Sequence, residues 1–346
     1  MQLGMFLEFP RPAGTSYREA FDSSFALVDE AESLGVDSVW LAEYHFNPGR
    51  VLSSPILIAT AIAARTERIR MGLAVQCLPL GHPVRLAEEA ATLDQLSNGR
   101  LEYGVGRGTF PNVHEGFNTP FAESRGRFEE SLEIIKKAWT EESFSFEGEF
   151  FQFQDLCVEP KPAQDPHPPM RVGITSAESF PITGRMGYPI LINPSRVFTF
   201  DELAEHIEAY RKSWHEAGHE GEPEVGLRVP IYVAETEEKA YSDPKEGAIF
   251  MYQRLGNRVM SYAEYGATTG DWQSEAGRIL GMEYDDWLRD KVAYGTPDQV
   301  AERISELRDS LGLTQFIYEI DLGNQLPLEL QLNSLRLFNR EVVPLL

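Results

Sequence analysis

The segment 72–108 constrains the fold more than any other part of the chain, because it predicts a strand, a helix and a second strand in succession. Residues 69–75 are apolar apart from Arg70, a pattern that is typical of a strand buried on both faces. Pro83 then opens a helix with an apolar side, and Gly99 closes it. A second strand, 101–105, leads to Arg107. Such a βαβ unit predicts a parallel sheet covered by helices.

Arg107 lies between Gly106 and Gly108, where missing side chains would let a phosphate approach the backbone. The guanidinium can bind a phosphate with two parallel hydrogen bonds. A structural salt bridge would explain this arginine equally well, since the local pattern Gly-x-Gly-x-Gly lacks the third glycine of the dinucleotide fingerprint. Both interpretations stay open from spacing alone.

The net charge of −23 over 346 residues argues against nucleic acid and against an anionic membrane surface as partners. A small-molecule substrate fits this charge better. An anionic cofactor would then need a local cation and helix N-termini, which points again to Arg107. Cys77 and Cys157 form no paired metal or redox spacing, and no apolar run has membrane length, so we expect a cytoplasmic protein.

Strands and helices alternate along the chain without a flexible linker, which predicts one domain over residues 1–346. Eight β/α units imply a (β/α)8 TIM barrel. A β-hairpin is expected around Gly148, outside the repeat. A Gly-, Tyr- and Trp-rich insertion at about 260–294 is a candidate lid with Tyr262, Tyr265, Trp272, Tyr284 and Trp287, or else a surface or dimer contact. The strands are expected at 1–6, 36–41, 69–75, 101–105, 170–174, 189–192, 225–233 and 313–320.

Chemistry in this barrel lies at the carboxyl ends of the strands, where the chain places several polar side chains. Ser176 and Ser179 begin a helix expected at 177–186, so their hydroxyls and free N–H groups would form an anion site. The alternative is that Ser176 only caps that helix, as Ser54 is expected to cap the helix that Pro55 opens. The other candidates are Tyr44, His45, Gln76, Cys77, Arg107, Thr175, Asn193, Glu319 and Asp321.

An ordered set of motifs resembles the bacterial luciferase-like flavin monooxygenases over essentially the whole chain. The set comprises Gly4 with Phe6, 40–46 (WLAEYHF), 78–85 (LPLGHPVR), 93–97 (LDQLS), 104–108 (GVGRG), 295–297 (GTP) and 338–344. The resemblance implies a TIM barrel that binds reduced FMN from a separate NAD(P)H:flavin reductase. It also implies activation of O2 as a flavin C4a-peroxide, and a homodimer.

The resemblance also assigns candidate cofactor contacts. Arg107, Ser176 and Ser179 match positions that hold the FMN phosphate in the luciferase α subunit, whereas Thr175 stands where the family has a glutamate. The flavin ring is expected to pass small or apolar residues of the first strands, Ala42, Ala74 and Val75, while Gly106 is expected to border the phosphate.

Tyr44 and His45 are the candidate catalytic residues. Bacterial luciferase has two adjacent histidines there, and Tyr44 stands at the first, to which catalysis is attributed. A tyrosine is a poor base at neutral pH but can donate a hydrogen bond to an oxygen of flavin or substrate, so we do not expect light emission. His45 could act as an acid or base, or hold a neighbouring loop.

The expected reaction is hydroxylation or Baeyer–Villiger oxidation of a small organic molecule. A noncatalytic flavin-binding partner subunit and a deazaflavin-dependent oxidoreductase are the alternatives. No metal is expected. His215 and His219 fit a zinc-protease spacing, but Gly218 and Pro223 would end the helix that must present both histidines on one face.

Overall fold

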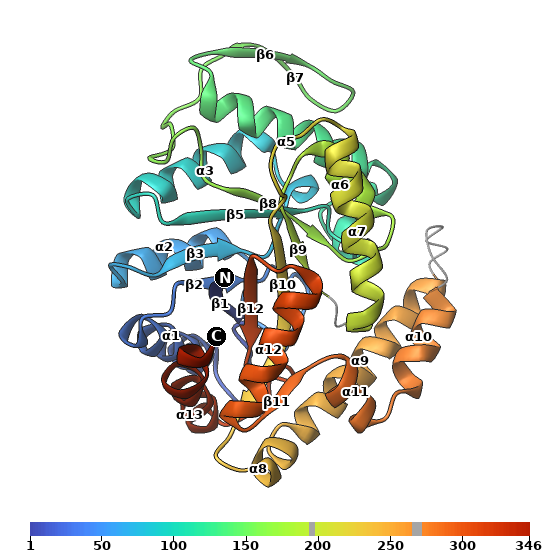
Figure 1. Ribbon diagram of the computed structural model, residues 1–346. Coiled ribbons are helices and arrows are strands. Elements are labelled where there is room, and N and C mark those ends of the chain that lie inside the picture. The colour runs from blue at the N-terminus through green and yellow to red at the C-terminus, as the bar shows by residue number, and fades with distance from the viewer. Residues whose placement is uncertain (194–197, 265–271) are drawn as a thin grey trace.

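Eight parallel strands close into a barrel in the computed structural model, which describes residues 1–193, 198–264 and 272–346 (Figure 1). Closure occurs because β9 pairs with β10 as well as with β8. The predicted (β/α)8 fold is therefore confirmed. The barrel strands are β1 (Gln2–Leu7), β2 (Ser38–Leu41), β3 (Arg70–Leu73), β5 (Leu101–Gly106), β8 (Met170–Ile174), β9 (Ile190–Ile192), β10 (Val225–Val233) and β12 (Gln315–Glu319).

Helices surround this barrel, and local sequence signals set several of their ends. Ser16 makes a capping box with Glu19, while Gly35 and Gly312 end helices in the left-handed conformation with φ of 84° and 61°. The helices are α1 (Tyr17–Leu34), α2 (Pro55–Arg65), α3 (Pro83–Leu96), α4 (Pro111–Gly116), α5 (Ser124–Thr140), α6 (Ser179–Met186), α7 (Phe200–Glu216), α12 (Pro297–Leu311) and α13 (Leu328–Leu337). Short 3₁₀ or π turns are η1 (Leu78–Leu80), η2 (Phe121–Glu123), η3 (Phe338–Val342) and η4 (Val343–Leu345).

Trp40 fills part of the barrel interior and explains two glycines on the neighbouring strands. Its side chain is fully buried and donates to Ser38 Oγ at 2.9 Å. A Cβ placed on Gly4 or Gly72 would lie 2.6 Å or 2.3 Å from the indole, so only glycine fits beside it. The packing of one large residue against two missing side chains fixes this side of the barrel.

The structure corrects three local expectations. The third strand is not continuous over 69–75, because β3 ends at Leu73 and a separate β4 (Gln76–Cys77) follows a cis peptide bond between Ala74 and Val75. Helix α6 begins at Ser179 rather than at residue 177. Ser54 makes no side-chain capping bond, although Pro55 does open α2.

The hairpin expected around Gly148 consists of β6 (Phe144–Glu147) and β7 (Gln152–Leu156), an antiparallel pair outside the barrel (Figure 1, top). Glu130 of α5 holds its turn, accepting from the backbone N–H groups of Glu149 at 2.7 Å and Phe151 at 3.1 Å. The hairpin therefore covers helix α5 on the side away from the strands.

The insertion after β10 is a group of helices with an apolar core of its own, at the lower right of Figure 1. Tyr284 and Trp287 are buried in this core and do not line the cavity described below, so their expected role as lid residues over the substrate is corrected. Tyr265 and the side chains of Tyr262 and Trp272 lie outside the described part. The elements are α8 (Glu237–Ser242), α9 (Lys245–Glu264), α10 (Trp272–Gly281), α11 (Tyr284–Asp290) and β11 (Ala293–Gly295), which pairs with β10.

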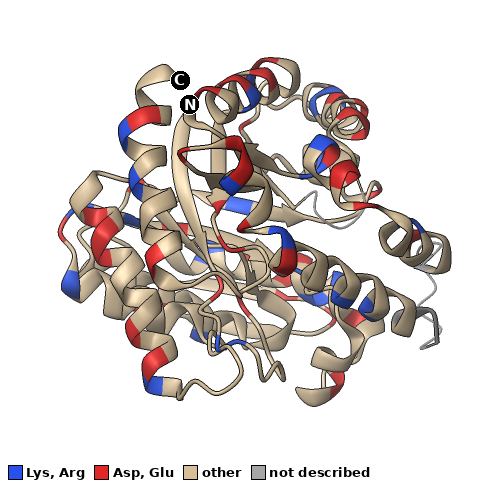
Figure 2. Ribbon diagram, turned by 90° about the horizontal axis from the view of Figure 1, so that it is seen from below, with Lys and Arg blue, Asp and Glu red and all other residues tan. Residues whose placement is uncertain are grey.

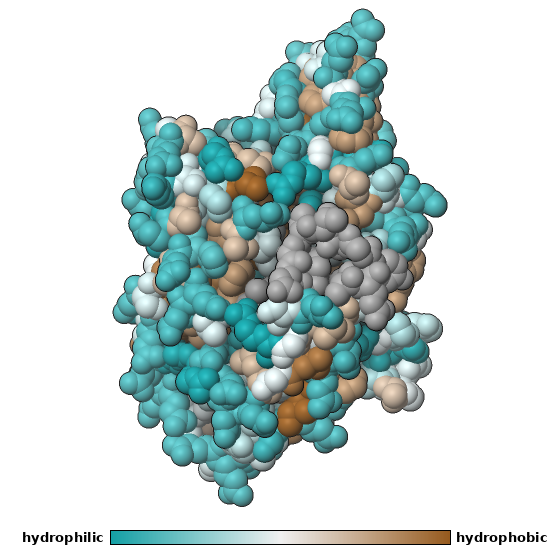
Figure 3. Space-filling view, turned by 90° about the vertical axis from the view of Figure 1, so that its right-hand side faces the viewer, coloured by the Kyte–Doolittle hydropathy of each residue, from teal (hydrophilic) through white to brown (hydrophobic). Residues whose placement is uncertain are grey.

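The charged residues of both signs lie largely on the outer helices, as the view from below shows (Figure 2). On the face that carries α7 and α10, apolar groups are scattered among hydrophilic ones wherever the surface is not grey (Figure 3). Among the described helices, none is both long and apolar enough to cross a membrane.

Candidate active site

A cavity of about 840 Å³ opens at the carboxyl ends of the strands, where this fold places its chemistry. The structure brings the candidate cofactor and catalytic residues together around it, although they come from four strand ends and the following loops, whereas the candidates Gln76, Glu319 and Asp321 do not line it. They are Ala42, Tyr44, His45, Ala74, Val75, Gly106, Arg107, Thr175, Ser176 and Ser179.

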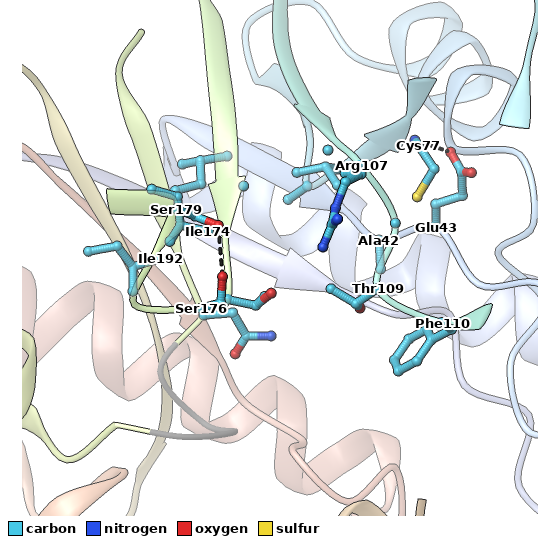
Figure 4. A pocket seen from close by; sticks show the side chains of 18 of the residues that line it. Ala42, Glu43, Cys77, Arg107, Thr109, Phe110, Ile174, Ser176, Ser179 and Ile192 are labelled. Carbon is cyan, nitrogen blue, oxygen red and sulfur yellow. Dashed lines mark hydrogen bonds between the residues drawn. The ribbon is translucent and has the colours of Figure 1, made fainter. Parts of the chain in front are cut away.

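Arg107 points into the cavity opposite Ser176 and Ser179 (Figure 4). The two serine hydroxyls are 2.8 Å apart, and the N–H of Ser179 donates to the carbonyl of Ser176 at 3.1 Å. Ser176 thus belongs to the turn before α6 and does not cap the helix. Within the described residues Arg107 makes no ion pair; its guanidinium lies 5.5 Å from the ring centre of Phe121. A cation facing two hydroxyls and a helix start can hold a phosphate.

Arg125 at the start of α5 adds positive charge to this corner, and our sequence analysis missed it. Its guanidinium forms an ion pair with the carboxylate of Glu178 at 3.0 Å, and Glu178 directly precedes Ser179 in the chain. Burial and the charge of Arg125 lower the pKa of Arg107, because both disfavour its positive charge. An anion bound at Arg107 would offset this repulsion. No glycine-flanked motif marks Arg125 in the sequence.

Val75 lies flat against two glycines and forms one wall of the cavity. A Cβ on Gly106 would lie 2.4 Å from Val75 Cγ2, and one on Gly173 would lie 2.6 Å from Val75 Cγ1. The flatness of this wall, with small Ala42 and Ala74 nearby on the lining, leaves a slot that suits a planar ring.

Tyr44 contacts a buried carboxylate as well as lining the cavity. Its hydroxyl donates a short hydrogen bond to Glu8, and the guanidinium of Arg50 lies 4.4 Å from its ring centre. Glu8 also accepts from Arg50 Nε at 2.7 Å and from Asn324 at 3.0 Å. Burial, together with Glu8, raises the pKa of Tyr44 to about 12, so this phenol stays neutral and its proton is held by Glu8.

Arg228 connects this cluster to the cavity floor, and it was also missed in the sequence. It lies within β10, contacts Glu319 Oε2 at 2.5 Å and Glu8 Oε1 at 3.5 Å, and lines the cavity. Burial raises the pKa of Glu319 to about 7, whereas the pKa of Glu8 is lowered to about 2, because Arg50 and Arg228 outweigh its desolvation. The sequence signal that could have identified Arg228 is its position as the one charged residue in the otherwise apolar run 225–233.

His45 points away from Tyr44 and pairs with a different carboxylate. Its Nε2 lies 2.9 Å from Glu43 Oε1, and its ring contacts Phe117 edge-on at 4.7 Å between centres. Glu43 Oε2 accepts from the backbone N–H of Cys77 at 3.3 Å (Figure 4). Burial and the charge of Glu43 raise the pKa of the Cys77 thiol. The arrangement offers a carboxylate–imidazole pair that can hold or move a proton at His45.

The insertion provides the remaining wall through Arg258, Val259, Ser274, Glu275 and Arg278. Three side chains of α9 and α10 fasten it to the barrel. Arg258 lies 3.8 Å above the ring centre of Phe110, Arg254 donates to Asn47 at 3.0 Å, and Arg278 pairs with Glu202 at 2.9 Å.

The helix that carries His215 ends before His219. Helix α7 ends at Glu216, and His219 Nε2 lies 2.9 Å from the carbonyl of Arg185. Across the described ranges, no group of three or more His, Cys, Asp or Glu side chains is placed to hold a metal ion.

Fold and cavity define a TIM barrel with an arginine and two serine hydroxyls gathered at the carboxyl face of its strands. The chain belongs to the luciferase-like monooxygenase family, whose model matches residues 1–315. The predicted family and the class of enzyme, a flavin-dependent monooxygenase, are therefore confirmed.

Similar proteins agree with this family. The oxygenase component of flavin-dependent trigonelline monooxygenase from Acinetobacter baylyi is 27% identical over 99% of this chain and 95% of its own length. The crystal structure of monooxygenase RslO1 from Streptomyces bottropensis is 28% identical, with a TM-score of 0.82 and 99% coverage of both chains. Coenzyme F420-dependent tetrahydromethanopterin reductase from Methanopyrus kandleri has the same fold at 20% identity and a TM-score of 0.75, with 99% of this chain and 98% of that one covered. The fold by itself therefore does not select the cofactor.

Proposed function

We propose that the chain is the oxygenase of a two-component system that uses reduced FMN and O2 to hydroxylate a small organic molecule or to oxidise it in a Baeyer–Villiger reaction. The observation that carries this proposal is the corner formed by Arg107, Ser176 and Ser179 beside the cavity wall of Val75, in a chain of the monooxygenase family. The name of the Acinetobacter relative, an oxygenase component, supports a separate NAD(P)H:flavin reductase as partner.

The residues present fit FMN. Arg107, Ser176 and Ser179, with Thr175 beside them, would hold the phosphate, and Ala42, Ala74, Val75 and Gly106 would border the ring. Bound in this way, reduced FMN would supply the electrons that activate O2. The chain's own task is then to orient the flavin, admit the substrate and exclude water.

We assign different roles to the two candidate catalytic residues. His45, oriented by Glu43, would hold or accept a proton at the ring nitrogen that Glu43 leaves free. Tyr44 is better suited to positioning, because its hydroxyl proton is engaged by Glu8. Its oxygen lone pairs remain able to accept a hydrogen bond from a bound group.

Other parts of the proposal concern the whole molecule. Residues 1–346 would act as one domain, with the segment around 260–294 as a cap over the cavity, supported by Ser274, Glu275 and Arg278 on its wall. A homodimer in the cytoplasm, without nucleic acid or membrane as partner, fits the family resemblance and the charge of −23.

The test is anaerobic titration of the pure protein with reduced FMN, followed by rapid mixing with O2 while flavin absorbance is recorded. Arg107→Gln is expected to weaken FMN binding about 10- to 100-fold, because a charge-assisted phosphate contact of about 1.5–3 kcal/mol is lost. The matched control is Arg18→Gln, an exposed arginine of α1. A transient absorbance distinct from oxidised FMN supports an oxygenase.

Other outcomes select the alternatives. Tight FMN binding with immediate reoxidation at every substrate tried, and activity only after a second barrel chain is added, would favour a noncatalytic partner subunit. Absence of FMN binding together with binding of a deazaflavin would overturn the proposal in favour of hydride transfer. Unchanged affinity in Arg107→Gln would place the phosphate elsewhere.

A further inference from the structure

His114 is a buried polar side chain whose hydrogen bonds are incomplete. It lies on α4 with none of its surface exposed, and neither ring nitrogen makes a well-formed hydrogen bond with a described residue, although the backbone of Arg107 and Gly108 lies beside the ring. Its ring packs edge-on against Phe121 at 5.2 Å between centres. A buried donor or acceptor left unpaired costs about 1–3 kcal/mol, so such a group calls for an explanation.

The imidazole lies directly behind the loop that carries Arg107. A Cβ on Gly108 would be 3.0 Å from His114 Nε2 and 3.6 Å from Cys77 Sγ, so the imidazole packs directly against the backbone of this loop at Gly108. Gly108 has a φ of +78°, and both Gly108 and His114 border the cavity. The backbone carbonyls of Arg107 and Gly108 lie beside the ring and can accept hydrogen bonds from it.

Burial favours the neutral ring when no anion is present. Burial lowers the pKa of His114 and the positive charge of Arg107 lowers it further, while the backbone of Gly108 and Arg107 acts in the opposite direction. The Cys77 thiol on the other side is neutral because its own pKa is raised. On the ring's own helix, Glu115 is exposed to solvent. Within the described part, Arg107 is thus the charge that acts on His114.

We propose that His114 is a proton-linked positioning residue of the phosphate site, neutral when the site is empty and protonated when a phosphate monoester dianion binds beside Arg107. This inference rests on the proposed function, since it takes the phosphate of FMN as the anion. The dianion offsets the field of Arg107 and favours a second positive charge nearby. As imidazolium, the ring has two N–H donors for the carbonyls of Arg107 and Gly108, which would stiffen the loop that holds the phosphate.

The sign of the pH dependence follows from linkage. Because binding raises the proton affinity of His114, the affinity for FMN falls as the pH rises through the pKa of the bound state. The FMN phosphate has a pKa of about 6, and its protonation at lower pH weakens FMN binding. This second effect is the same in every variant. Riboflavin has no phosphate, so its binding should not involve His114.

The experiment measures the affinity for FMN and for riboflavin by flavin fluorescence between about pH 6.5 and 8.5. The wild-type chain should lose about fivefold in FMN affinity over this range, whereas His114→Gln should lose less than twofold. His215→Gln, at a half-exposed histidine of α7, is the control and should behave as the wild type. Riboflavin affinity should be flat in all three proteins.

A second measurement uses only the wild-type chain, so it does not depend on whether a variant folds. Titration calorimetry in buffers of different ionisation enthalpy gives the number of protons taken up when the flavin binds. FMN binding near pH 7.5 should take up a fraction of a proton, and riboflavin binding none. Equal pH slopes in wild type and His114→Gln, or no net proton uptake with FMN, would refute the role of His114. Failure of Arg107→Gln to weaken FMN binding would instead refute the placement of the phosphate, so the two failures are distinct.

Discussion

Replacement of Glu8 by glutamine should destabilise the protein strongly and in a pH-dependent manner. The carboxylate of Glu8 is buried and accepts from Tyr44, Arg50 and Asn324. Its pKa is lowered from 4.5 to about 2, which is about 2.5 units. At about 1.4 kcal/mol per unit, the ionised form is favoured by about 3 kcal/mol in the folded chain. Glu8→Gln should therefore lose about this amount at pH 7.

The direction with pH follows from the lowered pKa. The contribution of Glu8 is fully present above about pH 4.5 and disappears as the pH falls towards 2. The difference between wild type and Glu8→Gln should accordingly shrink to roughly half at pH 3. The assay is urea-induced unfolding followed by tryptophan fluorescence at both pH values, with the free energy of unfolding extrapolated to water.

Glu319 belongs to the same cluster, but its pKa is shifted in the opposite direction from that of Glu8. Its pKa is raised to about 7, so its ionisation is penalised in the fold and its contribution to stability falls as the pH rises from about 4.5 to 7. Glu319→Gln should thus approach or exceed wild-type stability at pH 8. The exposed pair of Glu89 with Arg85 is the control, because Glu89→Gln should change stability by less than about 1 kcal/mol. A Glu8→Gln effect no larger than this control, or one equal at pH 7 and pH 3, would refute the reasoning.

Three further predictions concern packing, reactivity and the tyrosine. Gly72→Ala should cost about 1–3 kcal/mol in unfolding free energy, because its Cβ would lie 2.3 Å from the Trp40 ring; Gly277→Ala, with open space in α10, should be neutral or stabilising. Cys157, which is exposed, should react with iodoacetamide faster than buried Cys77, as peptide mass spectrometry can determine; equal rates would contradict the raised pKa of Cys77. Tyr44→Phe should lower stability by about 1 kcal/mol in urea and leave FMN affinity within twofold, whereas a large loss of FMN affinity would mean that the hydroxyl contacts the flavin instead of Glu8.

The sequence by itself determined the fold and much of the cavity lining. Apolar strands alternate with amphipathic helices, and stop signals such as Gly35 and Gly312 act over a few residues, so they can be recognised without the rest of the chain. The strand-end rule of the barrel then selected Arg107 and Ser176 for the same cavity, because parallel strands present their carboxyl ends on one side. The break of the third strand at Ala74 and Val75 was missed, since the apolar residues 71–75 carry no marker for it.

Only the tertiary structure decided which polar groups meet. Tyr44 contacts Glu8, 36 residues away, and His45 contacts Glu43 instead, although the two candidates are neighbours in sequence. Arg228 reaches Glu8 over 220 residues. Pairings of this kind depend on the strand order of the sheet, which places β10, β12, β1 and β2 side by side. Burial among those neighbours then fixes the protonation of each carboxyl group, because desolvation and nearby charges act through space and leave no mark in the local sequence.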